Sequence, residues 1–200
     1  MRGGELLEKA PVQKIARVLN LLVLTALVCN IIALYLVPAA VLTGREGLLE
    51  GVLAYFGHVF FPGEDDVVAA TIAGSAIVWV FVWSDAYNAA LTLFLLFSGC
   101  CTAVILWQAR RVLKTILRSE PFAPENAVSL RRAALCCFLI AAAALARVIF
   151  SIYYYRSPLP LATYNALFVP MFAMGGLLCW VCSALFRQAA EIKAENDLTI

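Results

Sequence analysis

The chain has 200 residues, of which 64% are hydrophobic and only 14% are charged, and its net charge is +2 at neutral pH. A typical soluble domain has about 25% charged residues, so this chain cannot cover a water-exposed surface and a soluble globular domain is excluded. The charge also lacks the basic surplus of a nucleic-acid-binding protein, and we expect no direct contact with nucleic acid. The composition predicts an integral membrane protein whose main surroundings are the lipid bilayer.

Four charge-poor stretches are long enough to cross a bilayer, since a helical crossing needs about 20 apolar residues. They cover residues 18–42, 86–107, 133–155 and 165–186, and the one charge inside them is Arg147. The first stretch is much longer than the core of a cleavable signal peptide, so we expect it to be retained. The sequence therefore predicts an all-α, single-domain membrane protein over residues 1–200, with an outer connection 43–85, an inner loop 108–132 and a tail 187–200.

The outer connection holds a further uncharged interval over residues 67–84, in which Val, Ile, Thr, Trp and Phe together make up most of the residues. Such a composition favours a β-strand, either alone at the membrane interface or in a hairpin with residues 52–61. A short amphipathic helix is expected over 48–61. The alternatives for 67–84 are an interfacial segment without regular strand structure, or a fifth span.

The distribution of Lys and Arg favours four spans over five. With four spans, one side of the membrane carries twelve of the 15 basic residues, and the other carries Arg45 and Arg156. A fifth crossing would separate the basic inner loop from the basic N-terminus. The positive-inside rule therefore predicts that both termini are cytoplasmic.

Two prolines organise the inner loop. Pro121 and Phe122 are expected to end one helix, and Pro124 followed by Glu125 is a typical helix start. We expect the helix from Pro124 to continue without a break into the third span.

Arg147 is a candidate functional residue, because an ionisable group inside a membrane span is costly. The structural alternative is that it extends toward the outer interface or pairs with Asp85. Tyr155 ends the same span eight residues later, which is about 12 Å along a helix.

All seven cysteines lie in apolar stretches, where we expect them to act as small packing residues. Cys179 and Cys182 have the spacing of a redox pair, but an apolar setting does not favour a reactive thiolate. Gly175, Cys179 and Ser183 instead form a small-residue stripe that predicts close helix packing.

The same spacing recurs at Gly99 and Ala103, and at Ala142 and Ala146. His58 is the single histidine and has no potential metal ligands at a suitable spacing. We therefore expect no catalytic, cofactor or metal site, and a protein that is not an enzyme.

Two segments resemble a known family: the inner-loop string EPFAPENAVSLRR and the C-terminal string AEIKAENDLTI. Together with four spans in about 200 residues, they resemble the bacterial membrane family catalogued as domain-of-unknown-function family 2975. The resemblance implies a multi-pass protein of the bacterial cytoplasmic membrane without an assigned activity, often encoded beside a small helix-turn-helix regulator. The chain departs from the expected pattern at Ala123, where a capping Ser or Thr is expected.

The resemblance places both distinctive segments on the cytoplasmic side, which suits a docking surface. The predicted function is the recruitment or sequestration of a small cytoplasmic DNA-binding regulator, and the alternative is a small transporter subunit or accessory membrane protein. Charge pairing is expected between the tail carboxylates and the arginines of the loop. The predicted partner-binding residues are Pro121, Phe122, Glu125, Asn126, Leu130, Arg131, Glu191, Lys193, Glu195, Asn196, Asp197, Leu198, Thr199 and Ile200.

Overall fold

A computed structural model describes residues 2–43, 83, 86–118 and 120–198. These residues form four long helices and one short 3-10 helix, and the described part of the chain contains no strand. In chain order the elements are α1 (Arg2–Thr43), α4 (Ala86–Leu117), α5 (Pro124–Tyr155), η2 (Leu159–Ala162) and α6 (Tyr164–Leu198).

Each long helix contains a stretch that is long and apolar enough to span a membrane, which confirms the predicted number for the described residues. These stretches are Gln13–Pro38, Ala86–Leu117, Pro124–Tyr155 and Tyr164–Asn196. The helix, strand or hairpin expected in the outer connection 43–85 falls outside the described residues, except for Trp83.

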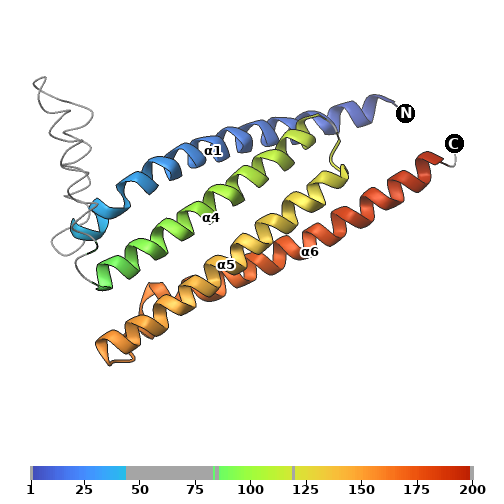
Figure 1. The fold of residues 1–200 in the computed structure, drawn as a ribbon. Helices are drawn as coiled ribbons and strands as arrows, with labels where there is room; N and C mark the ends of the chain where they lie inside the picture. Colours follow the sequence, from blue (N-terminus) through green and yellow to red (C-terminus); the bar gives the residue numbers. More distant parts are fainter. Residues whose placement is uncertain (1, 44–82, 84–85, 119, 199–200) are drawn as a thin grey trace, which may run out of the picture.

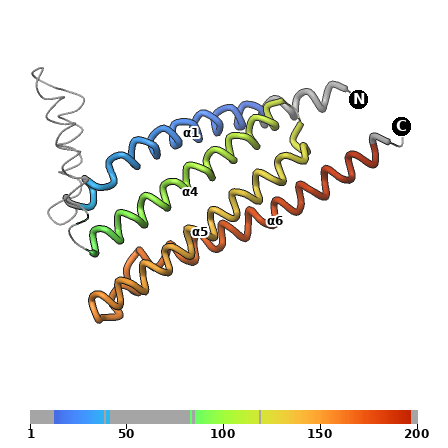
Figure 2. The backbone as a smooth tube through the Cα atoms, viewed as in Figure 1, coloured from blue at the N-terminus to red at the C-terminus, as the bar shows by residue number. Residues whose placement is uncertain are grey.

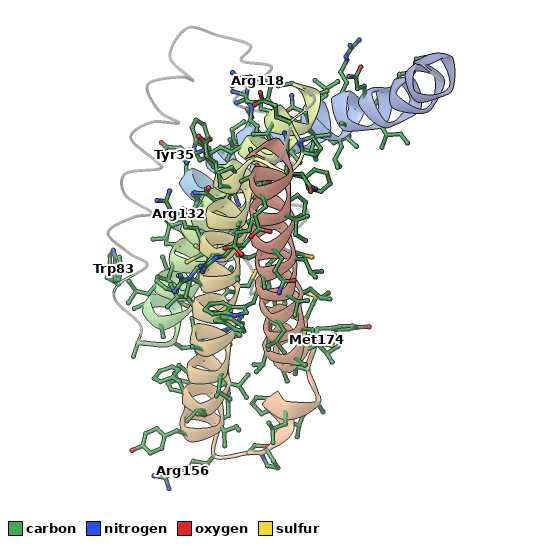
Figure 3. The ribbon with its side chains drawn as sticks, turned by 90° about the vertical axis from the view of Figure 1, so that its right-hand side faces the viewer. Tyr35, Trp83, Arg118, Arg132, Arg156 and Met174 are labelled. Atoms are coloured by element: carbon green, nitrogen blue, oxygen red, sulfur yellow. The ribbon has the colours of Figure 1, made fainter. Side chains whose placement is uncertain are left out.

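The four helices stand in an open row and do not close into a bundle (Figure 1). Along the described chain, α1 contacts α4, α4 contacts α5 and α5 contacts α6, while α1 meets neither α5 nor α6. The start of α1 and the end of α6 lie at the same end of the row (Figure 1), and the backbone trace shows the α4–α5 connection at this end, which we call the termini end (Figure 2). Arg118 and Arg156 mark the termini end and the opposite end of the row (Figure 3).

The helices extend beyond the predicted spans at the termini end. The 32 residues of α5 correspond to about 48 Å of helix, whereas the hydrocarbon core of a bilayer is about 30 Å thick. Most of the predicted inner loop is therefore helical, because α4 continues to Leu117 and α5 begins at Pro124. The fourth helix likewise continues through the predicted tail to Leu198.

The start of α5 agrees with the prediction from the prolines. Pro124 is the first helical residue, Ala123 before it has extended backbone angles (φ −63°, ψ 133°), and Glu125 lies in the first turn. Ala123 makes no side-chain capping bond. The turn is held instead by Asn126, whose residue surface is only 1% exposed.

Asn126 joins three pieces of the chain. Its Nδ2 donates a hydrogen bond to the carbonyl oxygen of Pro121 at 2.8 Å, and its Oδ1 lies 2.8 Å from the hydroxyl of Thr115 on α4. The Thr115 hydroxyl is also 2.7 Å from the Val112 carbonyl, so its proton is shared between two acceptors. The end of α4, the connecting turn and the start of α5 are thereby fixed together.

Small residues let α5 pack between its two neighbours. Its buried positions recur at helical spacing along one side, so that neighbouring backbones approach closely; they include Ala133, Ala134, Cys137, Ile140, Ala141, Ala144 and Val148. The predicted pair Ala142 and Ala146 is wrong, since both residues are exposed. Because Ala141 to Ala144 are all alanines, the sequence does not distinguish the alanines that face another helix from those that do not.

On α6, the predicted small-residue stripe is correct for Ser183, whose hydroxyl donates a hydrogen bond to the Ala127 carbonyl on α5 at 2.7 Å. It is wrong for Gly175, because a Cβ built there would meet nothing within 4 Å. The neighbouring Gly176 faces α5 instead, where a Cβ would lie 2.8 Å from the ring of Phe138. At Gly99 on α4 the prediction holds, because a Cβ there would lie 2.5 Å from Leu34 on α1.

Candidate functional site

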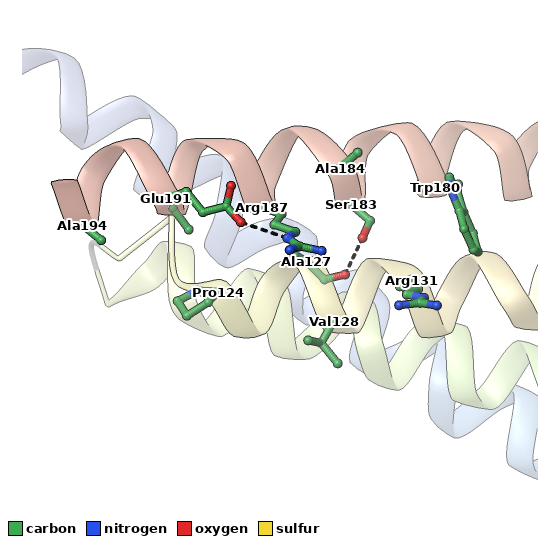
Figure 4. Close-up of a pocket in the computed structure, with 11 residues that line it drawn as sticks. Pro124, Ala127, Val128, Arg131, Trp180, Ser183, Ala184, Arg187, Glu191 and Ala194 are labelled. Carbon is green, nitrogen blue, oxygen red and sulfur yellow. Dashed lines mark hydrogen bonds and ion pairs between the residues drawn. The ribbon is translucent and has the colours of Figure 1, made fainter. Parts of the chain in front are cut away.

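A groove of about 740 Å³ lies at the termini end between the start of α5 and the end of α6 (Figure 4). We call it the α5–α6 groove. Apolar and small side chains form most of its surface, with charged groups along it; the lining residues are Pro124, Ala127, Val128 and Arg131 from α5, and Trp180, Ser183, Ala184, Arg187, Ala190, Glu191 and Ala194 from α6.

The charged groups of this groove are held by neighbours on the same two helices. The guanidinium carbon of Arg131 lies 5.4 Å from the ring centre of Trp180, in a cation–π arrangement between α5 and α6. Arg187 Nε pairs with Glu191 Oε1 at 2.9 Å, one turn along α6. Because these two side chains are 76% and 57% exposed, the pair contributes only about 0–1 kcal/mol to stability. Weak pairing of this kind leaves both charges available to an incoming group.

The structure brings two predicted partner-binding residues, Arg131 and Glu191, into this one groove. The predicted charge pairing is not found for Glu191, which pairs with Arg187 on its own helix instead of Arg131 or Arg132. A neighbour at i−4 on the same helix is always within reach. Pairing with α5 instead requires the charged side chains of the two helices to lie at the same level along the helix axes.

The other predicted residues of the inner loop divide into exposed and buried groups. Phe122 and Glu125 are exposed, whereas Pro121 and Leu130 are half-buried. Asn126 is buried with both ends of its amide bonded, so it shapes the turn and offers no surface to a partner.

Of the predicted tail residues, Lys193, Glu195 and Asn196 are exposed on the last turns of α6, and both Glu195 and Asn196 have an interaction within the chain. Asp197 and Leu198 are the last two residues of α6. Thr199 and Ile200 lie outside the described residues.

The sequence prediction missed nine of the eleven groove residues as partner-binding positions, among them Trp180, Ser183 and Arg187. Together with Glu191, these last three recur at intervals of three or four residues, which places them on one face of a helix. That spacing was visible in the sequence, but recognising it requires that α6 continue as one helix from the span into the tail.

Arg147 lies on α5, eight residues before the end of this helix, and is half-buried. Its guanidinium carbon is 4.9 Å from the ring centre of Phe94 on α4, a cation–π contact that links α4 and α5. Its predicted partner Asp85 is outside the described residues.

The cysteines in the described residues are free thiols. Two thiol pairs meet across helix interfaces: Cys101 with Cys136 between α4 and α5, and Cys137 with Cys179 between α5 and α6. This agrees with the predicted packing role for these four cysteines, whereas Cys29, Cys100 and Cys182 are exposed and do not follow the prediction. Within the described ranges, no three His, Cys, Asp or Glu side chains come close enough together to hold a metal ion.

A search of curated proteins and a search of solved structures each gave no match. A family comparison did, over the segment that contains α4, α5, α6 and the α5–α6 groove. The matched family carries the description "Protein of unknown function (DUF2975)", and its match covers residues 67–200. This chain therefore belongs to the DUF2975 family, as its inner-loop and C-terminal segments indicated.

Proposed function

We propose that this protein is a non-enzymatic module of the bacterial cytoplasmic membrane that recruits or sequesters a small cytoplasmic helix-turn-helix regulator. The observation that carries this proposal is the α5–α6 groove, which unites Arg131 from the inner loop with Glu191 from the tail. The class of partner comes from the family resemblance of these two segments. The groove supplies a place for it to bind.

The shape of the groove suits one amphipathic helix of the partner. Ala127, Ala184 and Ala190 leave room for side chains of an incoming helix, since small residues allow helices to approach closely. Arg131 and Arg187 lie beside this apolar surface and favour acidic residues flanking the apolar face of the guest. Helix-in-groove recognition commonly combines an apolar stripe with such charged flanks.

The proposed orientation places the termini end in the cytoplasm. Basic residues lie toward this end on the last turns of α4, directly after it, on the first turns of α5 and on the last turns of α6; they include Arg110, Arg111, Lys114, Arg118, Arg131, Arg132, Arg187 and Lys193. The positive-inside rule assigns such an end to the cytoplasm. A regulator bound there would be kept from its operator until a shift between two states of the groove released it.

The first test removes residues 191–200, which takes Glu191 and Ala194 from the groove. We expect insertion into the membrane and folding to persist, because the contacts that α6 makes with α5 before residue 191 remain. The purified candidate regulator from the neighbouring gene should no longer be retained in a pull-down in mild detergent. Equal retention by the full-length and truncated proteins would contradict the proposal.

The second test fills the groove. Ala184→Trp adds a large side chain to its surface, whereas Leu185→Trp makes the same addition at an adjacent, exposed position that does not line the groove. We expect only Ala184→Trp to reduce binding of the regulator. Equal binding by both variants, with normal membrane levels, would show that the groove is not the docking site.

The alternative function, a small transporter subunit, draws on a different observation. Buried polar atoms without a hydrogen-bond partner among the described residues occur along α1 and α4: Asn20 Oδ1, Asn30 Oδ1, Thr92 Oγ1, Ser98 Oγ and Gln108 Oε1. Polar groups of this kind line water-filled paths in transporters. If this alternative holds, Asn30→Leu should reduce solute flux into vesicles and leave regulator binding unchanged.

A further inference from the structure

A second groove of about 500 Å³ lies on another face of α5, between its first turns and the end of α4. We call it the α4–α5 groove. Trp107, Arg111 and Lys114 of α4, with Arg118 directly after its end, line one wall, and Glu125 and Ser129 of α5 contribute to the other. It shares no lining residue with the α5–α6 groove.

Trp107, Arg111, Lys114 and Arg118 form a narrow stripe, because the backbone N–H of Arg118 donates to the Lys114 carbonyl oxygen at 3.1 Å and so continues the last turn of α4. Their intervals of four, three and four residues keep them within about 60° around a helix that turns 100° per residue. Arg111, Lys114 and Arg118 therefore present three positive charges into one groove, against the single carboxylate of Glu125. All four charged side chains are exposed.

These charges have no internal partner in the described structure. The ion pair found there joins Arg187 and Glu191, and no hydrogen bond connects Arg111, Lys114 or Arg118 with Glu125. Neighbouring polar groups are already occupied, because Asn126 bonds to Thr115 and to the Pro121 carbonyl. The groove thus has a surplus of positive charge, and its basic side chains have hydrogen-bond donors that are available to a ligand.

The depth of the groove identifies the kind of anion it would meet. The uncharged part of α4 begins at Ala86 and reaches Ala109, and about 20 residues of helix cross the hydrocarbon core. Trp107, which is 53% exposed, therefore lies near the boundary of that core, where Trp is enriched. Arg111 lies about 6 Å farther along the helix and Lys114 about 10 Å, and the headgroup layer is about 5–8 Å thick. With the reach of their side chains, both cations meet the phosphate layer.

We propose that the α4–α5 groove binds the headgroup of an anionic phospholipid of the phosphatidylglycerol type. Arg111 and Lys114 bind the phosphate, and Arg118 lies at the edge of the groove farthest from the hydrocarbon core. Trp107 packs against the glycerol backbone and the first carbons of the acyl chains. Glu125 accepts a hydrogen bond from a headgroup hydroxyl. Basic pockets between membrane helices are established sites for anionic lipid headgroups, and this one is independent of any protein partner.

The experiment uses the full-length protein in mild detergent, with native mass spectrometry to measure the binding of phosphatidylglycerol, phosphatidylcholine and inorganic phosphate. The test variant is Arg111→Gln/Lys114→Gln/Arg118→Gln. The matched control is Lys14→Gln/Arg17→Gln/Arg132→Gln, which removes three exposed positive charges outside the groove. A charge-retaining variant, Arg111→Lys/Lys114→Arg/Arg118→Lys, separates loss of charge from loss of folding.

We expect the wild type to bind phosphatidylglycerol in preference to phosphatidylcholine. The test variant should lose affinity for phosphatidylglycerol by about tenfold or more, since each basic side chain near an anionic surface contributes several-fold. The matched control and the charge-retaining variant should bind nearly as the wild type does. If the triple Gln variant fails to fold, Arg111→Gln and Lys114→Gln are measured separately, and each should weaken binding.

Three outcomes would overturn the proposal. An equal loss of phosphatidylglycerol affinity in the control variant would mean that lipid binding depends only on the overall charge of the protein. Equal binding of phosphatidylcholine and phosphatidylglycerol by the wild type would show that the net charge of the headgroup does not determine binding. Displacement of phosphatidylglycerol by an equal concentration of inorganic phosphate would assign the groove to free phosphate and not to lipid.

Discussion

Gly176 is the position at which the contact between α5 and α6 can be tested most directly. A Cβ there would lie 2.8 Å from Cε1 and 2.9 Å from Cδ1 of Phe138, whereas a Cβ at the adjacent Gly175 would meet nothing within 4 Å. Gly176→Ala and Gly175→Ala therefore make the same chemical change, with and without a steric conflict.

The expected magnitudes separate the two variants. Replacing glycine by alanine within a helix favours the helix by about 1 kcal/mol, and this gain applies to both positions. Overpacking a well-filled interface costs about 1–3 kcal/mol, and only Gly176→Ala incurs this cost because the ring of Phe138 must move. The difference in the free energy of unfolding between the two variants should therefore be about 1–3 kcal/mol, with Gly176→Ala the less stable.

The assay is reversible unfolding in mixed micelles, followed by circular dichroism. A second variant identifies the partner: in a Phe138→Leu background, which removes the ring, Gly176→Ala should cost less than it does in the wild type. Equal stability of Gly176→Ala and Gly175→Ala, or an unchanged cost after Phe138→Leu, would refute the packing of α6 on α5 described above.

Three further predictions concern the turn, the orientation and the cysteines. Asn126→Ala should lower the free energy of unfolding by about 2 kcal/mol, because two hydrogen bonds are lost at about 1 kcal/mol each; unfolding in mixed micelles measures this, and an unchanged stability would count against the proposed role of Asn126. A cysteine placed at the exposed Arg118 should react with an impermeant reagent only after cells are permeabilised, whereas labelling in intact cells would reverse the proposed orientation. Cys179→Ala/Cys182→Ala should change the free energy of unfolding by less than about 1 kcal/mol and leave regulator binding intact; a disulfide between these two residues, detected by mass spectrometry of the wild type, would contradict this expectation.

The sequence alone was sufficient to predict the helical class, the four spans and the start of α5. These features depend on local properties of the chain. The length of an uninterrupted apolar run determines whether a helix can cross a bilayer, and Pro124 followed by Glu125 favours a helix start whatever packs around it. The family was also predictable, because the inner-loop and tail strings are contiguous in the chain.

The choice of interface residues was not predictable in the same way. The periodic pattern of small residues suited Gly175 as well as Gly176, and Ala142 as well as Ala141, since a helix that is apolar on all sides gives no hydrophobic signal for the face that meets a neighbour. In a bilayer both faces are apolar, so close packing determines the interface. Only the relative placement of α5 and α6 shows that Gly176 faces Phe138.

The two grooves depend on the tertiary structure for the same reason. The sequence placed Arg131 and Glu191 in separate segments and suggested that they pair, but the positions of α5 and α6 put them in one groove with Glu191 bonded to Arg187. Arg111 and Lys114 contributed to the charge count from which the orientation was predicted, yet that count does not show that α5 lies beside them. The sequence determined which charges gather at the termini end, because span lengths and the positions of basic residues are local properties of the chain. The order of the helices in the row decided which of those charges share a groove. That order depends on contacts between residues far apart in the chain, so only the tertiary structure shows it.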